Sequence, residues 1–439
     1  LPVPNPTISH WLSEPHPLHN HRSTPDLPAE CDVLIIGTGM AGVTTAYHLT
    51  EQTSPTPPSI LLLEARSTCS GATGRNGGHS KVQARTLTGF LDRVGEETTN
   101  EFNRLVHGII YDLKGIVERE GIECEFELRR SFDVFLDEGD ARKAHEAFEQ
   151  QCKNGCEWVK DISWIDERYA EKITSVRGAA GAFSVPACSL WPYKFCTQLL
   201  STILARHPTT NLQTNTPVHA VTPASSGHLF HVHTPRGTVL ARKIIYATNA
   251  YTGGLLPSYK PVIVPTKGTA ASLAIPESKP PVQPHLSCTY NIDYGGGKVD
   301  YFNPRPEGRR IVLGGASWLF RGEKGKWRGV VDDSTLMGEE VERYFERYMQ
   351  RNFLGWEGSG CERERVWTGI MGSTPDQLPH VGKVPGTSNA WILAGFNGGG
   401  MSMIPACAKG VAKMVAEDAA YEDVGLPGFF KTTEERLKR

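Results

Sequence analysis

A glycine pattern suited to phosphate binding lies near the start of the chain, at residues 37–42. Its spacing, G-x-G-x-x-G, follows the apolar run CDVLIIG directly and precedes a segment with helical spacing. The first glycine permits a tight turn, the second lets a pyrophosphate approach the backbone, and the third lets helix and strand pack closely. Free N–H groups and the positive end of the helix dipole then face the phosphate. We therefore expect a dinucleotide to contact Gly37, Gly39, Met40, Ala41 and Gly42.

An acidic residue stands where the ribose of such a dinucleotide is expected. Glu64 ends the second apolar run, SILLLEA, 22 residues after Gly42. A carboxylate at this position accepts hydrogen bonds from both ribose hydroxyls, which favours NAD or FAD over NADP. The alternative is a tight turn without a ligand, but the strand, glycines, helix, second strand and acid all occur in order. Glu64, Ala65 and Arg66 are predicted cofactor contacts.

A second glycine-rich run, RSTCSGATGRNGGHSKVQ, occupies residues 66–83. Glycine has no Cβ, so backbone rich in it can lie against a flat ring where side chains would clash. His79 is the titratable group that we place nearest the reacting ring, and a histidine satisfied by its own loop is the alternative. Arg75 is expected to pair with a phosphate or a carboxylate, or else to brace the loop. The predicted contacts here are Gly71, Ala72, Thr73, Arg75, Asn76, Gly77, Gly78 and His79.

The elements around these segments predict an α/β protein. CDVLIIG and SILLLEA are short apolar runs typical of buried strands, and the strand–helix–strand unit they form predicts parallel pairing with a right-handed crossover. Helical patterns cover residues 91–119, 138–153, 193–208 and 334–353, and hairpins are expected at 235–237 and 306–308. Near the end, NAWILAGFNGGGMSM indicates a strand, a glycine turn and a further helix.

Composition and charge restrict the partners. A formal net charge of −2 argues against a nucleic-acid partner, and no apolar run approaches the roughly 20 residues of a membrane span. The start lacks a secretory pattern, and the ten cysteines are scattered without a CxxC pair, which favours reduced thiols over disulfides or a metal site. We expect a cytoplasmic protein, with a peroxisomal location left open. Residues 1–29 are proline-rich, and we expect an extended, exposed arm that includes His10, His16, His19 and His21.

Three separated segments carry a resemblance to a known family. They are DVLIIGTGMAGVTTAYHL…ILLLEA, then SGATGRNGGH, then GIMGSTPDQLPHVGKVPGTSNAWILAGFNGGGMS, with the weaker ATNAY between the last two. In this order they resemble the D-amino-acid-oxidase-like flavoproteins, which include glycine, sarcosine and γ-glutamylputrescine oxidases. The middle segment is most similar to the γ-glutamylputrescine oxidase branch.

The resemblance implies FAD as cofactor and oxidation of a C–N bond in an amine or amino acid. The family transfers a hydride from the carbon to flavin N5, water hydrolyses the imine, and oxygen reoxidises the flavin to give hydrogen peroxide. A helix start after the second glycine turn would point its dipole at the flavin carbonyl end, where negative charge develops on reduction. The further cofactor contacts are then Val218, Thr248, Asn249, Gly372, Gly395, Asn397, Gly398, Gly399, Gly400 and Met401.

The resemblance also implies two domains. A discontinuous Rossmann-like FAD-binding domain is expected from residues 30–90, 186–262 and 363–418. An α+β substrate domain on an antiparallel sheet is expected from 91–185 and 263–362, followed by a tail at 419–439. On its 301–305 strand, Tyr301 and Arg305 alternate toward one face, where they would contact substrate together with His79. The plain alternative is an exposed Pro-Arg-Pro turn.

Two departures from the family pattern bear on mechanism. Sarcosine oxidases attach flavin through a cysteine just before the STPD segment, where this chain has Thr368 and Gly369. Their oxygen-activating lysine belongs to the strand matching RIVLGG, where this chain has Val312, although Lys267 could substitute. Cys69 and His79 remain candidate covalent anchors.

The sequence is therefore compatible with more than one electron acceptor and more than one activity. The alternatives to an oxidase are a dehydrogenase of the same fold with another electron acceptor, a catalytically idle flavin-binding protein, and a plain NAD-dependent dehydrogenase.

Overall fold

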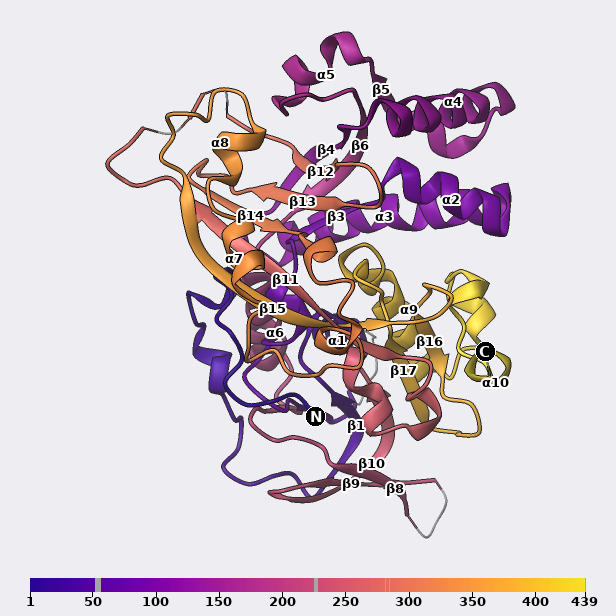
Figure 1. Ribbon diagram of the computed structural model, residues 1–439. Helices are drawn as coiled ribbons and strands as arrows, with labels where there is room; N and C mark the ends of the chain where they lie inside the picture. The colour runs from indigo at the N-terminus through magenta and orange to yellow at the C-terminus, as the bar shows by residue number, and fades with distance from the viewer. Residues whose placement is uncertain (52–56, 225–227, 281, 284, 439) are drawn as a thin grey trace.

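Two β-sheets form the framework of the computed structural model, which describes residues 1–51, 57–224, 228–280, 282–283 and 285–438 (Figure 1). The first sheet has the order β16-β17-β10-β1-β2-β7. Its pairs from β17 to β7 are all parallel, and β16 and the β8–β9 hairpin add antiparallel edges. This confirms the parallel strand–helix–strand unit. The strands are β1 (Glu30–Ile36), β2 (Ile60–Leu63), β7 (Thr210–Gln213), β8 (Ala220–Pro223), β9 (Phe230–Thr234), β10 (Gly237–Tyr246), β16 (His380–Lys383) and β17 (Ala390–Ala394).

The second sheet has the order β15-β11-β14-β13-β12-β4-β6-β3, with β5 paired to β6. All of its pairs are antiparallel except β12 with β4. The expected antiparallel sheet is thus confirmed. Its strands are β3 (His79–Lys81), β4 (Glu127–Phe135), β5 (Ser163–Ile165), β6 (Gly181–Ser189), β11 (Val264–Ala274), β12 (Thr289–Asp293), β13 (Val299–Pro304), β14 (Arg310–Gly314) and β15 (Glu362–Ser373).

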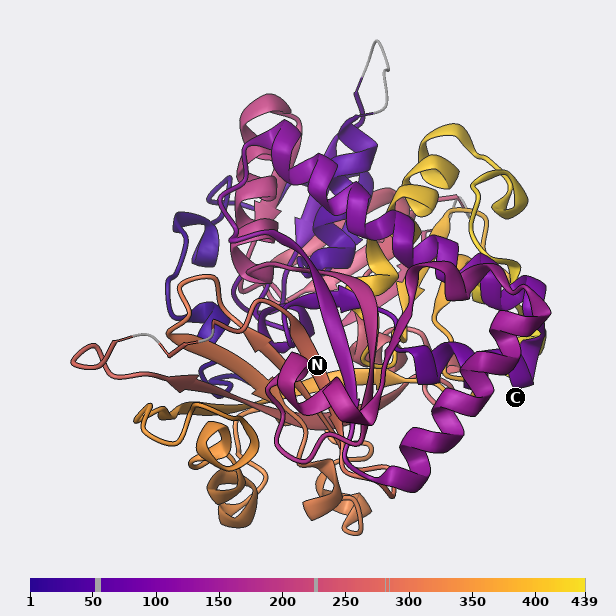
Figure 2. The ribbon, with the colours of Figure 1, turned by 90° about the horizontal axis from the view of Figure 1, so that it is seen from above.

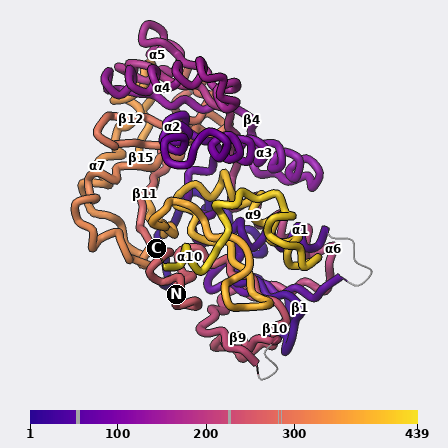
Figure 3. Tube along the Cα trace, turned by 90° about the vertical axis from the view of Figure 1, so that its right-hand side faces the viewer, coloured from indigo at the N-terminus to yellow at the C-terminus, as the bar shows by residue number. Residues whose placement is uncertain are grey.

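Helices pack on both sheets. Figures 2 and 3 show the long α3 passing over α6 and α9. The helices are α1 (Met40–Thr50), α2 (Ala84–Val94), α3 (Glu96–Glu120), α4 (Glu138–Asn154), α5 (Glu167–Thr174), α6 (Pro192–Arg206), α7 (Glu339–Tyr344), α8 (Tyr348–Asn352), α9 (Ile404–Glu417) and α10 (Glu434–Leu437). Within the described ranges, none combines the length and the hydropathy that crossing a bilayer requires.

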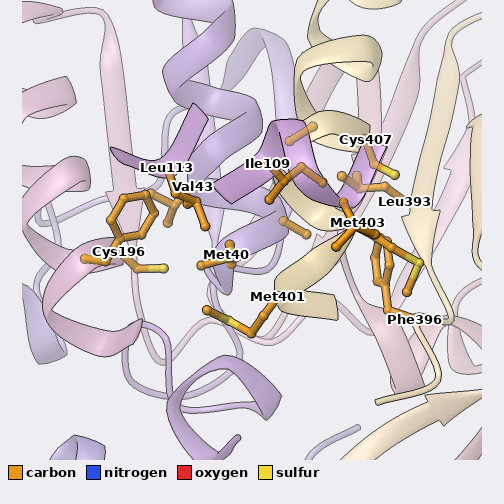
Figure 4. Close-up of a cluster of buried hydrophobic side chains, with 14 of the residues drawn as sticks. Met40, Val43, Ile109, Leu113, Cys196, Leu393, Phe396, Met401, Met403 and Cys407 are labelled. Carbon is orange, nitrogen blue, oxygen red and sulfur yellow. The ribbon is translucent and has the colours of Figure 1, made fainter. Parts of the chain in front are cut away.

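A buried apolar cluster joins these helices behind the phosphate-binding turn. Met40 and Val43 of α1, Ile109 and Leu113 of α3 and Cys407 of α9 meet there (Figure 4). The same cluster contains Phe396 and Met401, which extend from the second glycine turn. The core therefore fixes that turn relative to the start of α1.

The prediction of a single helix over residues 334–353 is wrong. The segment forms α7 and α8, separated at Arg347, whose φ of 51° lies in the left-handed region. The hydroxyls of Tyr344 and Tyr348 both donate to Asp300 Oδ2, at 2.6 and 2.9 Å. Tertiary contacts of this kind override a helical pattern.

The N-terminal segment also differs from the exposed chain expected there. Residues His10–Leu12 and Pro17–Asn20 form 3₁₀ helices, and His10 and Trp11 are buried. Prolines at a first helical position are compatible with this geometry, because the N–H they lack has no partner there. The proposed domain boundaries stay a prediction: β3 and most of β15 fall in ranges assigned to the FAD domain but pair in the second sheet.

Candidate active site

A cavity of about 710 Å³ lies where loops of the first sheet meet strands of the second. Its volume is within the roughly 300–1,000 Å³ common for ligand sites. Loops after β1 and β2 line one part, and β11, β13 and β15 line another. The predicted site residues that line it are Gly37, Gly39, Ala41, Glu64, Ala65, Arg66, Gly71, Ala72, Thr73, Arg75, Asn76, Gly77, His79, Val218, Thr248, Asn249, Tyr301, Asn397, Gly398, Gly400 and Met401.

Seven predicted residues do not line this cavity: Met40, Gly42, Gly78, Gly372, Gly395, Gly399 and Arg305. Most of these glycines serve close packing. A Cβ on Gly42 would lie 1.9 Å from Gly37 O, and one on Gly372 would lie 2.8 Å from Asn249 Oδ1. Asn249 Oδ1 also accepts the Gly395 N–H at 3.1 Å. These glycines therefore bring the loops together rather than admit a ligand.

The phosphate-binding turn has the geometry that its spacing predicts. Gly37 has a φ of 109°, and α1 begins after Gly39, so its first N–H groups have no partners within the helix. Glu64 Oε2 accepts the N–H and hydroxyl of Thr38 at 2.9 and 2.7 Å. Its oxygens keep further acceptor capacity toward the cavity. Met40 does not face the cavity, because it is buried and its N–H donates to Thr73 Oγ1 at 3.0 Å.

The second glycine run has a different explanation from the one expected. A Cβ on Gly77 would lie 2.8 Å from the Tyr301 ring, and one on Gly78 would lie 2.7 Å from the Trp11 ring. Only at Gly71, of the glycines from 71 to 78, would a Cβ meet no protein atom within 4 Å. Gly77 and Gly78 therefore accommodate protein side chains, and Gly71 is the one with open space beside it.

His79 and Tyr301 lie together in the wall of the cavity. Their rings meet edge to face with centroids 5.6 Å apart. Burial lowers the pKa of His79 well below its usual value, and the nearby charges of Lys81 and Arg129 lower it further. Its Nδ1 is buried, and no residue in the described part of the chain forms a hydrogen bond with it. At neutral pH the imidazole is therefore uncharged.

Two arginines of the cavity share one buried carboxylate. Arg66 Nη1 and Nη2 lie 2.9 and 3.1 Å from the two oxygens of Asp333, and Arg75 Nε lies 3.5 Å from Oδ2. Arg75 also donates to the carbonyls of Ser70 and Thr368. Its Nη2 is buried and has no hydrogen-bond partner among the described residues. Arg75 braces the loop, as one alternative held, while one of its N–H groups stays free for a ligand.

Another part of the lining is cationic and aromatic. Lys267 on β11 lines the cavity, and its Nζ donates to Thr335 Oγ1 at 2.8 Å. Burial lowers the pKa of this amine. Phe320, Arg321 and Trp327 line the cavity from the segment after β14. The sequence reasoning missed these three, because the segment has no periodic pattern or motif.

Arg305 lies away from the cavity. Its guanidinium is buried and pairs with Glu125 at 2.7 Å, and it lies over the Trp11 ring at 5.3 Å. The parity argument is right for Tyr301 and Asn303, because Asn303 Nδ2 donates to Gly77 O at 2.8 Å. Arg305 continues the same face beyond the end of the site.

Cys69 is a poor candidate for covalent attachment. It is fully buried near Cys196 and does not line the cavity. Burial raises the pKa of the thiol well above its usual value, so little of the reactive thiolate is present.

The residues present fit FAD. The glycine turn and Glu64 suit a pyrophosphate and a ribose, the free Nη2 of Arg75 suits an anion, and space is open beside Gly71. Gly398 and Gly400, close before α9, line the same cavity as His79. The two glycine-rich regions, far apart in sequence, thus meet around one site.

Comparisons with known proteins agree with this geometry. The chain is 22% identical over 401 residues to gamma-glutamylputrescine oxidoreductase of Escherichia coli K12, covering 90% of this chain and 85% of that protein. It is 30% identical over 148 residues to a Bacillus subtilis protein described as a Rieske 2Fe-2S iron-sulfur protein. That match covers 31% of this chain and only 28% of the longer relative.

Among solved structures, glycine oxidase from Geobacillus kaustophilus superposes with a TM-score of 0.69 at 18% identity, covering 93% of this chain and 99% of that one. The FAD dependent oxidoreductase family, DAO, matches residues 32–414. The chain therefore belongs to the DAO family of FAD-dependent oxidoreductases, the family to which its glycine turns and its cavity point.

Proposed function

We propose that this protein oxidises a C–N bond of an amine or amino acid, followed by hydrolysis of the imine by water. When bound, FAD supplies the hydride acceptor at N5 and passes the electrons to oxygen, giving hydrogen peroxide. The chain's own residues bind the substrate and orient its amine. The observation that carries the proposal is the meeting of both glycine-rich regions with His79 and Tyr301 around one cavity.

The uncharged His79 suits an orienting role. An imidazolium would repel an ammonium group, whereas a neutral imidazole can accept a hydrogen bond from the amine. Because the pKa of His79 lies well below its usual value, a proton leaving the amine passes on to solvent. The amine's own pKa should then set the acid limb of the pH profile. Substrates with amines of different pKa should shift that limb correspondingly.

The charges of the lining favour a substrate with a carboxylate. Glu64 is the one acidic side chain among the lining residues of the described chain, whereas Arg66, Arg75, Lys267 and Arg321 are cationic. Arg66 and Arg75 share Asp333, whereas Lys267 and Arg321 form no ion pair with the described residues, although the charges of Asp332 and Asp333 act on Lys267. These two cations can hold a substrate carboxylate, so amino acids should reduce the bound flavin better than simple amines of the same length.

The test is anaerobic mixing of the purified flavoprotein with a panel of amines and amino acids, followed by loss of flavin absorbance. His79→Ala should retain its flavin and slow reduction by on the order of 10–100-fold, because the amine loses its orienting partner. His145→Ala, on α4, serves as the matched control. A panel in which no amine bleaches the flavin contradicts the proposed reaction, and an unchanged rate in His79→Ala contradicts the role of that residue.

Mixing the reduced protein with oxygen separates an oxidase from a dehydrogenase. A buried cation promotes the oxygen reaction by stabilising the charge that develops. Lys267→Met should therefore slow reoxidation by roughly tenfold or more, measured on protein that has been fully reduced anaerobically with saturating substrate, so that weaker binding of the substrate carboxylate does not affect the rate. Lys153→Met, on α4, is the control. Slow reoxidation of the unmodified protein would favour a dehydrogenase that uses another electron acceptor.

A further inference from the structure

We propose that residues 7–12, which we call the N-terminal strap, position residues 71–79, which we call the active-site loop. Arg75 and His79 belong to this loop. Trp11 and Thr7 are the positioning residues. The strap precedes the matched family region at residues 32–414. The inference rests on the proposed function for the role of His79.

One end of the strap holds the backbone just before His79. Trp11 is fully buried, and its Nε1–H donates to Asn76 O at 2.6 Å. Its ring packs where a side chain on Gly78 would have to lie. Asn303 Nδ2 also donates to the carbonyls of Gly77 and Gly78, at 2.8 and 3.2 Å. The short segment 76–78 is thus held by Trp11 and Asn303.

The other end of the strap holds the backbone and side chain of the Arg75 region. Ser9 Oγ donates to Gly74 O at 2.6 Å. Thr7 Oγ1 accepts from Arg75 Nη1 at 3.2 Å and from Thr368 N–H at 3.0 Å. It also lies 3.0 Å from Asp333 O, to which it donates. One hydroxyl therefore ties the strap to the loop, to β15 and to the segment that carries Asp333.

Trp11 itself is anchored independently of the loop. Its carbonyl accepts the Trp191 Nε1–H at 2.8 Å, its ring meets the Trp191 ring at 5.5 Å, and the guanidinium of Arg305 lies over it. Arg305 in turn pairs with Glu125. This gives a physical role to the buried Arg305: it supports the indole that supports the loop.

An external constraint is needed because glycine-rich backbone loses much conformational entropy when it is held in one conformation. Glycine has the greatest conformational freedom of any residue, and residues 71–78 contain four of them. Neither Trp11 nor Thr7 lines the cavity, so neither can act by touching substrate or cofactor there. Their effect on the site must pass through the loop.

The test uses the full-length flavoprotein and two conservative variants. Trp11→Phe keeps an aromatic ring but removes the N–H, and Thr7→Val keeps the shape but removes the hydroxyl. Amide hydrogen exchange of the peptide covering 72–80 should accelerate by roughly three- to tenfold in each, the range for one lost hydrogen bond. The controls are Trp158→Phe, whose buried Nε1 has no partner, and Thr197→Val, whose hydroxyl bonds within α6.

The kinetic readout separates positioning from general destabilisation. With an amine that reduces the flavin, Trp11→Phe should lower kcat more than it raises KM, and this loss should vanish in a His79→Ala background. Loop exchange in Trp11→Phe no faster than in Trp158→Phe overturns the strap. Faster loop exchange in Trp11→Phe, together with an unchanged rate of flavin reduction in His79→Ala, supports the strap and overturns the role proposed for His79.

Discussion

Gly71 and Gly77 belong to one loop but are glycine for different reasons. Gly77 faces the Tyr301 ring, whereas no protein atom lies within 4 Å of a Cβ on Gly71. From sequence composition alone the two positions are equivalent, because each is a glycine without a side chain in the same glycine-rich run. Their surroundings separate a packing requirement from space available to a ligand.

Alanine at these positions should therefore give opposite results. Gly77→Ala should lower the free energy of unfolding by about 1–3 kcal/mol, because the methyl group overlaps the Tyr301 ring. Gly71→Ala should keep the unfolding free energy of the flavin-free protein but lower the ratio of flavin to protein after purification. Urea titration and absorbance measure the two quantities. Equal flavin content in Gly71→Ala and the parent would show that the cofactor does not lie against Gly71.

The buried His380 should make the free energy of unfolding depend on pH. Burial, with the charge of Arg436, lowers its pKa from 6.5 to about 4. Between these values the unfolded chain binds more protons than the folded one, so stability falls as pH falls from 6.5 toward 4. The slope from this group is roughly 1.4 kcal/mol per pH unit. His380→Gln should flatten the measured slope in urea titrations across that window, and an identical slope in both proteins would refute the assignment.

At the scale of elements, the break between α7 and α8 marks where tertiary contacts prevail over local pattern. The segment from 334 to 353 has helical spacing throughout, yet Arg347 adopts a left-handed conformation. The break allows Tyr344 and Tyr348 to reach Asp300 together. Asp300 is buried at the start of β13, so this contact attaches both helices to the second sheet.

Arg347 is therefore a site where glycine should be tolerated or favourable. The left-handed backbone conformation costs a residue with a side chain roughly 1–2 kcal/mol. Glycine avoids most of this cost, but its backbone loses more conformational entropy on folding. Arg347→Gly should leave the free energy of unfolding unchanged or raise it by up to about 1 kcal/mol. Arg347→Ala is the matched control. Marked destabilisation by glycine alone would indicate that the helix is continuous in solution.

At the scale of the whole molecule, Asp333 connects the parts that enclose the cavity. Its carboxylate pairs with Arg66 and Arg75 from the first half of the chain, and its carbonyl accepts from Thr7. The segment after β14 is thereby attached to residues 66–75 and to the N-terminal strap. The cavity depends on these contacts, because neither sheet encloses it alone.

Asp333→Asn should destabilise the protein strongly. The change leaves the buried Arg75 and the partly buried Arg66 without their carboxylate, and breaking a buried pair costs about 3–5 kcal/mol. Glu422→Gln removes an exposed pair with Lys431 and should leave the free energy of unfolding nearly unchanged. Urea titration of the two variants measures the difference. A cost for Asp333→Asn as small as that of the exposed pair would refute the connecting role.

The antiparallel second sheet was expected from the resemblance to the family. Local order in the sequence was enough to predict the phosphate-binding turn, the parallel unit around it and both hairpins. Each depends on residues close together in the chain: Gly37 and Gly39 with the strand before them, or the turn at 306–308 with its flanking strands. Glu64 at the end of β2 and Tyr301 on β13 followed from position and parity for the same reason.

The tertiary structure alone decided which predicted residues share one cavity. Gly78 faces Trp11, Arg305 pairs with Glu125, and Arg347 breaks a helical pattern because of partners distant in sequence. Glycine content shows where a side chain is absent, and strand parity shows which face of the sheet a side chain occupies. Neither pattern shows which residue packs against that position. The burial of Trp11 and the meeting of residues 71–79 with 398–401 come from packing between distant segments, which no local pattern encodes.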